Sequence, residues 1–227
     1  MFSALFARMG DSDCEFVESG LLVQPANAVS SLAYSLIGAA IVVWAFRVSG
    51  HNRVVRIAFG VVVVATGVGS VMFHGPQGWG SQFLHDITFL TALLFLAVFN
   101  LTAARSKNAA ASWAYFIAGA VVLAVSLVVS PGVTNALMIA VVVALVASDV
   151  ALFRRSVRWT KWYVTGLVAS AAALSMFVLG RTDGILCDPS STFQGHAVWH
   201  ILGAVALGAY FVATTAVREG VSQKVTR

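Results

Sequence analysis

The chain has 227 residues, of which 59% are hydrophobic and only 10% are charged, and its mean hydropathy is +0.88. A soluble globular domain averages about 25% charged residues, so this composition excludes a soluble protein. A membrane-spanning helix needs about 20 mostly apolar residues. Spans of that length account for most of the chain, which leaves no room for a separate soluble domain.

Seven apolar segments of spanning length follow one another along the chain. They lie at about 27–47, 54–73, 83–104, 110–129, 135–153, 162–180 and 195–217. Their connections are short, and several contain helix breakers such as Pro76 and Pro131. The sequence therefore predicts an all-α, polytopic membrane protein with seven transmembrane helices. We expect a single domain over residues 1–227, with an N-terminal segment 1–25 and a C-terminal tail 218–227.

The positive charges gather on one side of the predicted spans. Of the 14 Lys and Arg residues, twelve lie on the connections or span ends of one side, and only Arg8 and Arg181 lie on the other. Because cytoplasmic loops carry an excess of Lys and Arg, this distribution predicts an N-terminus outside and a C-terminus in the cytoplasm. It also accounts for the basic charge, so we expect no nucleic-acid partner. The expected location is a prokaryotic cell membrane.

The chain has two cysteines, Cys14 and Cys187. The predicted topology places both outside the cell, where disulfides persist. A bridge would connect the N-terminal segment to the connection before the last span. Two unpaired cysteines are the alternative, and our hypothesis is the disulfide.

Ionisable side chains inside spans are costly, about 2.5 to 3.5 kcal/mol for an aspartate at mid-bilayer, and are functional candidates by default. The candidates here are His74, His85, Asp86, Asp149, His196 and His200. All but Asp149 fall within about two helical turns of the predicted outer face. Asp149 falls near the inner face, close to Arg154 and Arg155, and we interpret it as a snorkelling or ion-paired structural acid.

The spacing of three histidines suggests a metal site. His196 and His200 are four residues apart and therefore project from one helix face, as do Ser70 and His74. Two imidazoles one turn apart can bind one metal ion, a third ligand can come from a neighbouring helix, and a fourth position can stay open for water. Each histidine alone is more simply a hydrogen-bonded core residue. Together they predict a catalytic zinc site.

His85 and Asp86 are adjacent, so on a helix their side chains point about 100° apart. We therefore do not expect the two side chains to face the same metal ion. We assign Asp86 to the site and interpret His85 as a loop or interface residue.

Several short motifs occur at these positions. They are Gly69-Ser70-Val71-Met72-Phe73-His74, Asp86 twelve residues later, His196-Ala197-Val198-Trp199-His200, and Cys14-Glu15 followed by Asn27-Ala28-Val29-Ser30-Ser31. In these motifs the sequence resembles the CREST superfamily of seven-span membrane hydrolases and receptors, most closely its alkaline ceramidase branch. Spans four to six contribute only hydropathy to the resemblance.

The resemblance implies a zinc ion held by His74, His196 and His200, with Ser70 and Asp86 beside the attacking water. Zinc makes water a nucleophile near neutral pH. Asp86 would act as general base and then general acid, and Ser70 would donate a hydrogen bond to the developing oxyanion. The implied substrate is a lipid amide that enters from the bilayer. Ceramide, cleaved to a sphingoid base and a fatty acid, is the family's case.

The family's ceramidases also bind calcium through an acidic N-terminal segment. Here Glu15 matches an acidic ligand position and Asp13 offers a further oxygen, as calcium requires. A solvated acidic tail is the alternative for both residues. A non-enzymatic receptor or lipid-binding protein with a structural zinc is the second functional hypothesis, and the sequence does not separate it from the hydrolase. A channel is disfavoured because the polar residues gather at one face.

Overall fold

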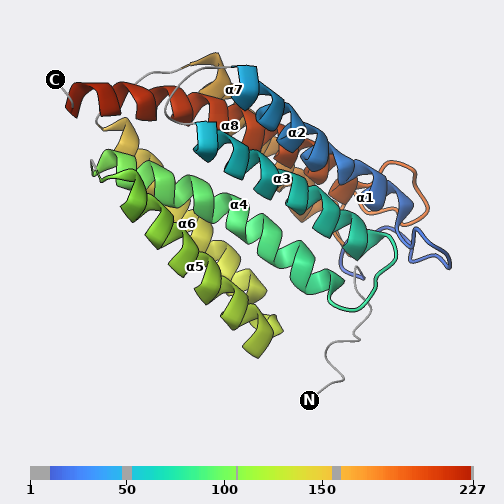
Figure 1. The fold of residues 1–227 in the computed structure, drawn as a ribbon. Coiled ribbons are helices and arrows are strands. Elements are labelled where there is room, and N and C mark those ends of the chain that lie inside the picture. Colours follow the sequence, from blue (N-terminus) through green and yellow to red (C-terminus); the bar gives the residue numbers. More distant parts are fainter. Residues whose placement is uncertain (1–10, 48–52, 106, 155–159, 226–227) are drawn as a thin grey trace. The chain divides into compact units, whose positions relative to one another are not determined.

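The computed structural model describes residues 11–47, 53–105, 107–154 and 160–225. Their helices, shown in Figure 1, are α1 (Pro25–Ser30), α2 (Leu32–Arg47), α3 (Arg53–His74), α4 (Ser81–Ala104), α5 (Ala109–Val129), the short 3-10 helix η2 (Pro131–Val133), α6 (Thr134–Phe153), α7 (Lys161–Leu179) and α8 (Gly195–Val225). In α8, side chains are described as far as Thr215.

Seven helical segments of the described chain are long and apolar enough to cross a membrane. Two of them are composite: Pro25–Arg47 combines α1 and α2, and Pro131–Phe153 combines η2 and α6. The ends of all seven agree with the predicted spans to within four residues. The all-helical, seven-span prediction is confirmed, whereas the single domain and the orientation of the termini stay predictions.

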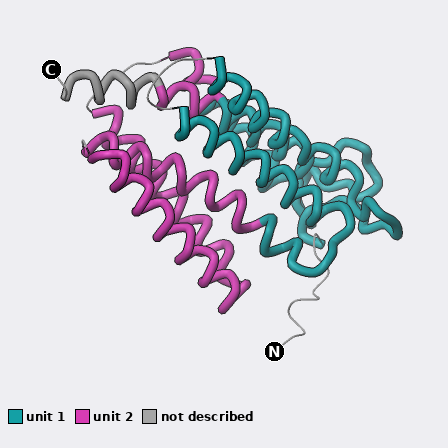
Figure 2. Tube along the Cα trace, viewed as in Figure 1, with its two compact units in different colours: residues 1–85, 166–208 teal, residues 86–165, 209–227 magenta. Residues whose placement is uncertain are grey.

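The chain forms two compact units (Figure 2). The first consists of Met1–His85 and Gly166–Gly208, and the second of Asp86–Thr165 and Ala209–Arg227. The helices α4, α7 and α8 therefore contribute residues to both. All the predicted histidine ligands belong to the first unit.

Small residues allow α2 and α3 of the first unit to lie side by side (Figure 1). A Cβ atom added to Gly38 would lie 2.5 Å from the carbonyl oxygen of Gly60. A Cβ atom on Gly67 would lie 2.2 Å from the hydroxyl oxygen of Ser35. Close backbone approach through small residues is typical of helix pairs in membranes. It brings the start of α2 against the end of α3, where the candidate site lies.

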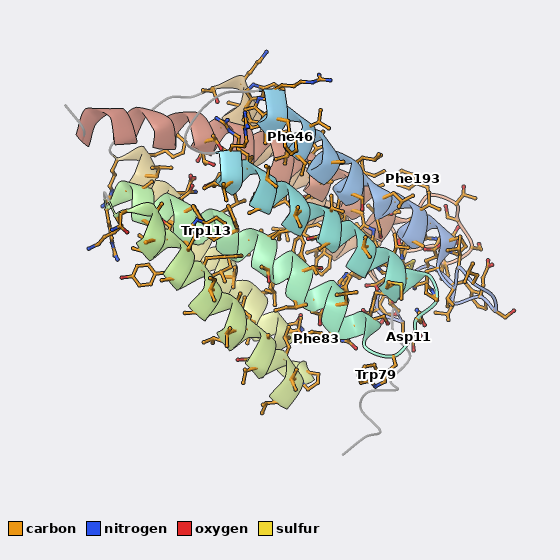
Figure 3. The ribbon with its side chains drawn as sticks, in the orientation of Figure 1. Asp11, Phe46, Trp79, Phe83, Trp113 and Phe193 are labelled. Atoms are coloured by element: carbon orange, nitrogen blue, oxygen red, sulfur yellow. A yellow bond between two sulfur atoms is a disulfide. The ribbon has the colours of Figure 1, made fainter. Side chains whose placement is uncertain are left out.

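Aromatic rings hold α4 and α5 together in the second unit. Phe95 and Phe99 of α4 stack at 4.3 Å between ring centroids, and Phe99 contacts Trp113 of α5 edge to face at 5.2 Å. Such pairs are worth about 0.5 to 1.5 kcal/mol beyond their area. Trp113 is labelled in Figure 3.

Asp149 has partners in the second unit that the sequence did not suggest. The hydroxyl of Tyr163 donates to its carboxylate at 2.7 Å, and the hydroxyl of Tyr210 donates to its other oxygen. Asp149 therefore has tyrosine partners, which fits a structural acid, and Arg155 lies outside the described residues. Tyrosines reach this carboxylate because α6, α7 and α8 each bring one of the three residues to the same depth.

Candidate metal centre

Three buried histidines meet at one end of the first unit. His74 is the last residue of α3, while His196 and His200 lie one turn apart at the start of α8. The His74 ring centroid lies 5.0 Å from each of the other two, and those two are 4.5 Å apart. Their exposed fractions are 0%, 5% and 1%. The predicted ligand residues therefore lie close together.

Each of the three rings has an oxygen atom next to its Nδ1. The pairs are His74 with the side-chain oxygen Oε1 of Gln24 at 2.7 Å, His200 with the carbonyl oxygen of Asn27 at 3.1 Å, and His196 with the carboxylate oxygen Oδ1 of Asp13 at 3.5 Å. At His74 and His200 an acceptor at Nδ1 favours the neutral tautomer with its proton there, whereas Nδ1 of His196 makes no hydrogen bond in the described part of the chain. That tautomer leaves the Nε2 lone pair available, as in most metal-ligating histidines.

The Nε2 atoms show that the cluster suits a metal ion. Within the described residues, those of His74 and His196 are buried and make no hydrogen bond. A buried polar atom without a partner is destabilising, and such atoms are rare. A cation held between the rings would satisfy both. Nitrogen ligands of this kind suit zinc and several other divalent transition metals.

The bend between α1 and α2 supplies the oxygen beside His200. Helix α1 begins at Pro25, a residue favoured in the first turn, and stops after one and a half turns. The hydroxyls of Ser30 and Ser31 donate to the carbonyl of Asn27 at 3.0 and 2.6 Å. Such back-bonding often bends helices. Here the bend occurs where the carbonyl of Asn27 faces the ring of His200.

Ser70 lies one turn before His74 on α3, as its spacing predicted. Its hydroxyl is 2% exposed and lies 2.8 Å from the hydroxyl of Ser31. It also lies 3.4 Å from Nε2 of His200. Because Ser31 directs its own proton to Asn27, it can accept the proton of Ser70. The hydroxyl of Ser70 thus lies next to Nε2 of His200, a nitrogen that can bind a metal ion.

Glu15 anchors the N-terminal segment to α1. Its two carboxylate oxygens accept the backbone N–H groups of Ala26 and Asn27 at 2.6 and 2.8 Å. A carboxylate at the first turn satisfies N–H groups that have no partner within the helix. Burial raises the pKa of Glu15, and the two backbone hydrogen bonds oppose that rise. Glu15 and Asp13 thus both have protein partners, and calcium at these residues stays a prediction.

The predicted disulfide between Cys14 and Cys187 is present. It joins the N-terminal segment to the connection between α7 and α8. Two backbone contacts reinforce the link: the N–H of Cys14 donates to the hydroxyl of Thr182 at 3.2 Å, and the N–H of Phe16 donates to the carbonyl of Pro189 at 3.2 Å. The segment that carries Asp13 and Glu15 is therefore held on both sides.

Asp86 lies in α4, one residue after His85, and belongs to the second unit. Its carboxylate is 9% exposed and accepts a hydrogen bond from the hydroxyl of Thr134 at 3.0 Å. Thr134 is the first residue of α6. The predicted catalytic role of Asp86 stays a proposal.

His85 lies in a helix and packs against α3, so of the two sequence interpretations the loop is wrong and the interface is confirmed. It lies on α4, its ring stacks on Phe73 at 4.6 Å, and its ring centroid is 5.8 Å from that of His74. The potential ligand atoms of His74, His85 and His200 lie within 4.8 Å of one another. The rotation argument said only that His85 and Asp86 would not both face one metal ion, and among the described residues His85 belongs to such a group while Asp86 does not.

A second group of potential ligand atoms overlaps the first. It contains Asp13, His74 and His196, again within 4.8 Å of one another. His74 is therefore common to both groups. The buried histidine and aspartate side chains can hold a metal ion, and the choice among the ligands belongs to the proposal below.

A family model for ceramidases matches residues 14–226. The chain belongs to the ceramidase family. The match includes all seven spans, both cysteines and every candidate site residue except Asp13. A comparison with curated proteins finds no match. Membership indicates that this ceramidase-family protein is a membrane-embedded hydrolase with a lipid substrate.

Sequence reasoning gave no role to Gln24, Asn27 or Ser31. Asn27 and Ser31 appeared there only within the motif Asn27-Ala28-Val29-Ser30-Ser31. The contact of Asn27 with His200 runs through a backbone carbonyl, which leaves no mark in the sequence. The sequence signal for these residues was a cluster of polar side chains around the start of the first predicted span.

Proposed function

We propose that this protein is a zinc-dependent hydrolase of a lipid amide, with ceramide as substrate and a sphingoid base and a fatty acid as products. The observation that supports the proposal most strongly is the buried histidine cluster, in which two Nε2 atoms have no partner among the described residues. Family membership supports the hydrolase.

His74, His196 and His200 would hold the ion through their Nε2 atoms. Zinc bound there would supply Lewis acidity, which lowers the pKa of water towards 7 and polarises a carbonyl. Ser70 would donate a hydrogen bond to the carbonyl oxygen as it gains negative charge. Asp86 would accept the proton of the attacking water and deliver it to the amine when the C–N bond breaks.

The position of the cluster suits a substrate that comes from the bilayer. The histidines lie at the end of one span and the start of another, and therefore near a membrane boundary. Two exposed aromatic residues flank them in sequence: Trp79, 95% exposed, follows His74, and Phe193, 67% exposed, precedes His196 (Figure 3). Aromatic rings favour the membrane interface.

The proposed orientation places this end outside the cytoplasm of a prokaryotic cell. The charge distribution supports it, and so does the disulfide, because disulfides are rare in the cytosol. Both native cysteines are bridged, so an introduced cysteine is the sole free thiol. In intact cells, an impermeant thiol reagent is expected to label Ser190→Cys but not Lys107→Cys. The opposite pattern would reverse the orientation.

The central experiment combines elemental analysis of the purified protein with hydrolysis of a panel of N-acyl lipids. We expect one zinc per chain, release of fatty acid from ceramide, loss of activity with a chelator, and recovery when zinc is restored. Activity that is unchanged in metal-stripped protein would refute the metal-dependent mechanism. Hydrolysis of another N-acyl lipid in place of ceramide would correct the substrate alone.

We also propose that Asp13 and Glu15 bind calcium, as the family resemblance implies. Binding would require oxygens that already accept two backbone hydrogen bonds at Glu15. The test is the melting temperature in calcium and in a calcium-selective chelator. A rise with calcium that is lost in Glu15→Gln would support the site, and no rise in the unaltered protein would reject it.

A lipid-binding protein with a structural zinc is the second candidate, and His85 favours it. A fourth imidazole within reach of His74 and His200 could fill the position that a catalytic zinc keeps open for water. A protein that binds zinc and ceramide but releases no fatty acid would support this candidate.

A further inference from the structure

Asp13 faces His196 in a buried environment. Its oxygen Oδ1 lies 3.5 Å from the Nδ1 atom, and both side chains are 6% exposed. The other two rings of the cluster face neutral oxygens, an amide and a backbone carbonyl. At Nδ1, His196 is the ring of these three that lies next to a carboxylate.

We propose that Asp13 is a positioning residue that orients His196 for metal binding through Nε2, an inference that rests on the proposed metal centre. At 3.5 Å the two atoms are in electrostatic contact, and Nδ1 of His196 makes no hydrogen bond among the described residues. A cation at Nε2 makes the Nδ1 proton more positive, so the attraction to the carboxylate increases when the ion is bound. A carboxylate behind a ligating histidine fixes its tautomer and ring orientation and raises its basicity.

The backbone around Asp13 is fixed, as this role requires. Its neighbour Cys14 is bridged to Cys187 and has a φ of 70°, a left-handed conformation that few non-glycine residues adopt. On the other side, the carbonyl of Ser12 accepts the N–H of Thr182 at 3.1 Å. Asp13 therefore cannot move away from His196 without the loss of contacts on both sides.

Direct ligation by Asp13 is the competing arrangement. Its oxygen, His74 and His196 all lie within 4.8 Å of one another, close enough to share one ion. The two arrangements differ in the number and type of metal ligands. Cobalt can replace zinc and reports both through its visible absorption spectrum.

The test measures zinc affinity, by competition with a chromophoric chelator, and the spectrum of the cobalt-substituted protein. The variants are Asp13→Ala and Asp13→Asn, and the control is Asp183→Asn in the exposed connection between α7 and α8. We expect Asp13→Ala to weaken zinc binding 10- to 100-fold. Asp13→Asn should weaken it less, because the amide oxygen can still accept the Nδ1 proton. The control should bind like the unaltered protein, and cobalt spectra should keep their shape and intensity.

Equal affinity in all variants would overturn the positioning role, and so would equal losses in Asp13→Asn and Asp13→Ala. A cobalt spectrum that changes in Asp13→Ala would show that Asp13 is a ligand and would also overturn it. If Asp13→Ala does not fold, Asp13→Asn carries the test, and affinity equal to that of the unaltered protein refutes the proposal. Absence of zinc and cobalt binding in the unaltered protein would instead refute the proposed metal centre.

Discussion

Gln24 and His74 are joined twice, through their side chains and through their backbones. The side-chain oxygen of Gln24 lies 2.7 Å from Nδ1 of His74, and the N–H of Gln24 donates to the carbonyl of His74 at 2.8 Å. The amide nitrogen Nε2 of Gln24 also donates to the carbonyl of Glu15 at 3.1 Å. One fully buried side chain therefore links the N-terminal segment to a ring of the metal centre.

Gln24→Ala is expected to lower zinc affinity 10- to 100-fold, because it removes the acceptor that orients the His74 ring. Gln24→Glu should retain most of the affinity, since a carboxylate oxygen can accept the same proton. The matched control is Gln82→Ala on the exposed face of α4. Competition with a chelator measures all three. A loss as large in Gln24→Glu as in Gln24→Ala would contradict the orienting role.

His85→Ala and His196→Ala together decide which imidazoles bind the metal. If the ligands are His74, His196 and His200, His196→Ala removes zinc and activity, whereas His85→Ala retains one zinc per chain. We expect zinc to be lost from His196→Ala and kept in His85→Ala, because Nε2 of His196 makes no hydrogen bond within the described residues and can bind the ion. Elemental analysis gives the stoichiometry. Zinc lost from His85→Ala but kept in His196→Ala would assign the site to the other ligand group.

Asp86→Ala should lower the rate of amide hydrolysis about 100-fold or more while most of the zinc remains, because it removes proton transfer and no proposed ligand. Thr134→Val removes one hydrogen bond to this carboxylate, and we expect a decrease of about tenfold. Fatty-acid release and zinc content are measured on the same samples. Full activity in Asp86→Ala would contradict the proton-transfer role.

Replacement of both cysteines, Cys14→Ser with Cys187→Ser, should lower the melting temperature and weaken zinc binding. The bridge closes a loop with a sequence separation of 173 residues, and loops of that size are worth a few kcal/mol in the chain-entropy estimate. Zinc affinity should fall because Asp13 loses the anchor next to it. Reductant added to the unaltered protein should reproduce both effects. Unchanged affinity in both experiments would separate the disulfide from the metal centre.

Tyr163→Phe and Tyr210→Phe should each lower thermal stability, because each removes a donor to the partly buried carboxylate of Asp149. Hydrogen bonds between membrane helices average about 0.6 kcal/mol and reach about 1.7 kcal/mol. Zinc content should not change, because these residues belong to the second unit. Thermal denaturation in detergent measures the effect. Melting temperatures equal to that of the unaltered protein would show that these bonds contribute nothing.

The sequence by itself determined the spans, the residues that flank them and the pairing of Cys14 with Cys187. Span length and hydropathy are local properties, so every predicted segment appears within four residues of its predicted ends. The pair His196 and His200 is also local, because a spacing of four places two side chains on one helix face. Six spans separate Cys14 from Cys187, and an even number of crossings places both on one side of the membrane.

Only the tertiary structure decided what surrounds each histidine. The oxygens beside the three rings come from residues 13, 24 and 27, one of them a backbone carbonyl turned towards His200 by the bend at Ser31. The position of His85 near His74 and His200 and the hydrogen bonds of Asp149 to two tyrosines were also decided by tertiary structure. Such contacts depend on how each helix is rotated and how closely its neighbour approaches, and a pattern along one chain does not contain either quantity.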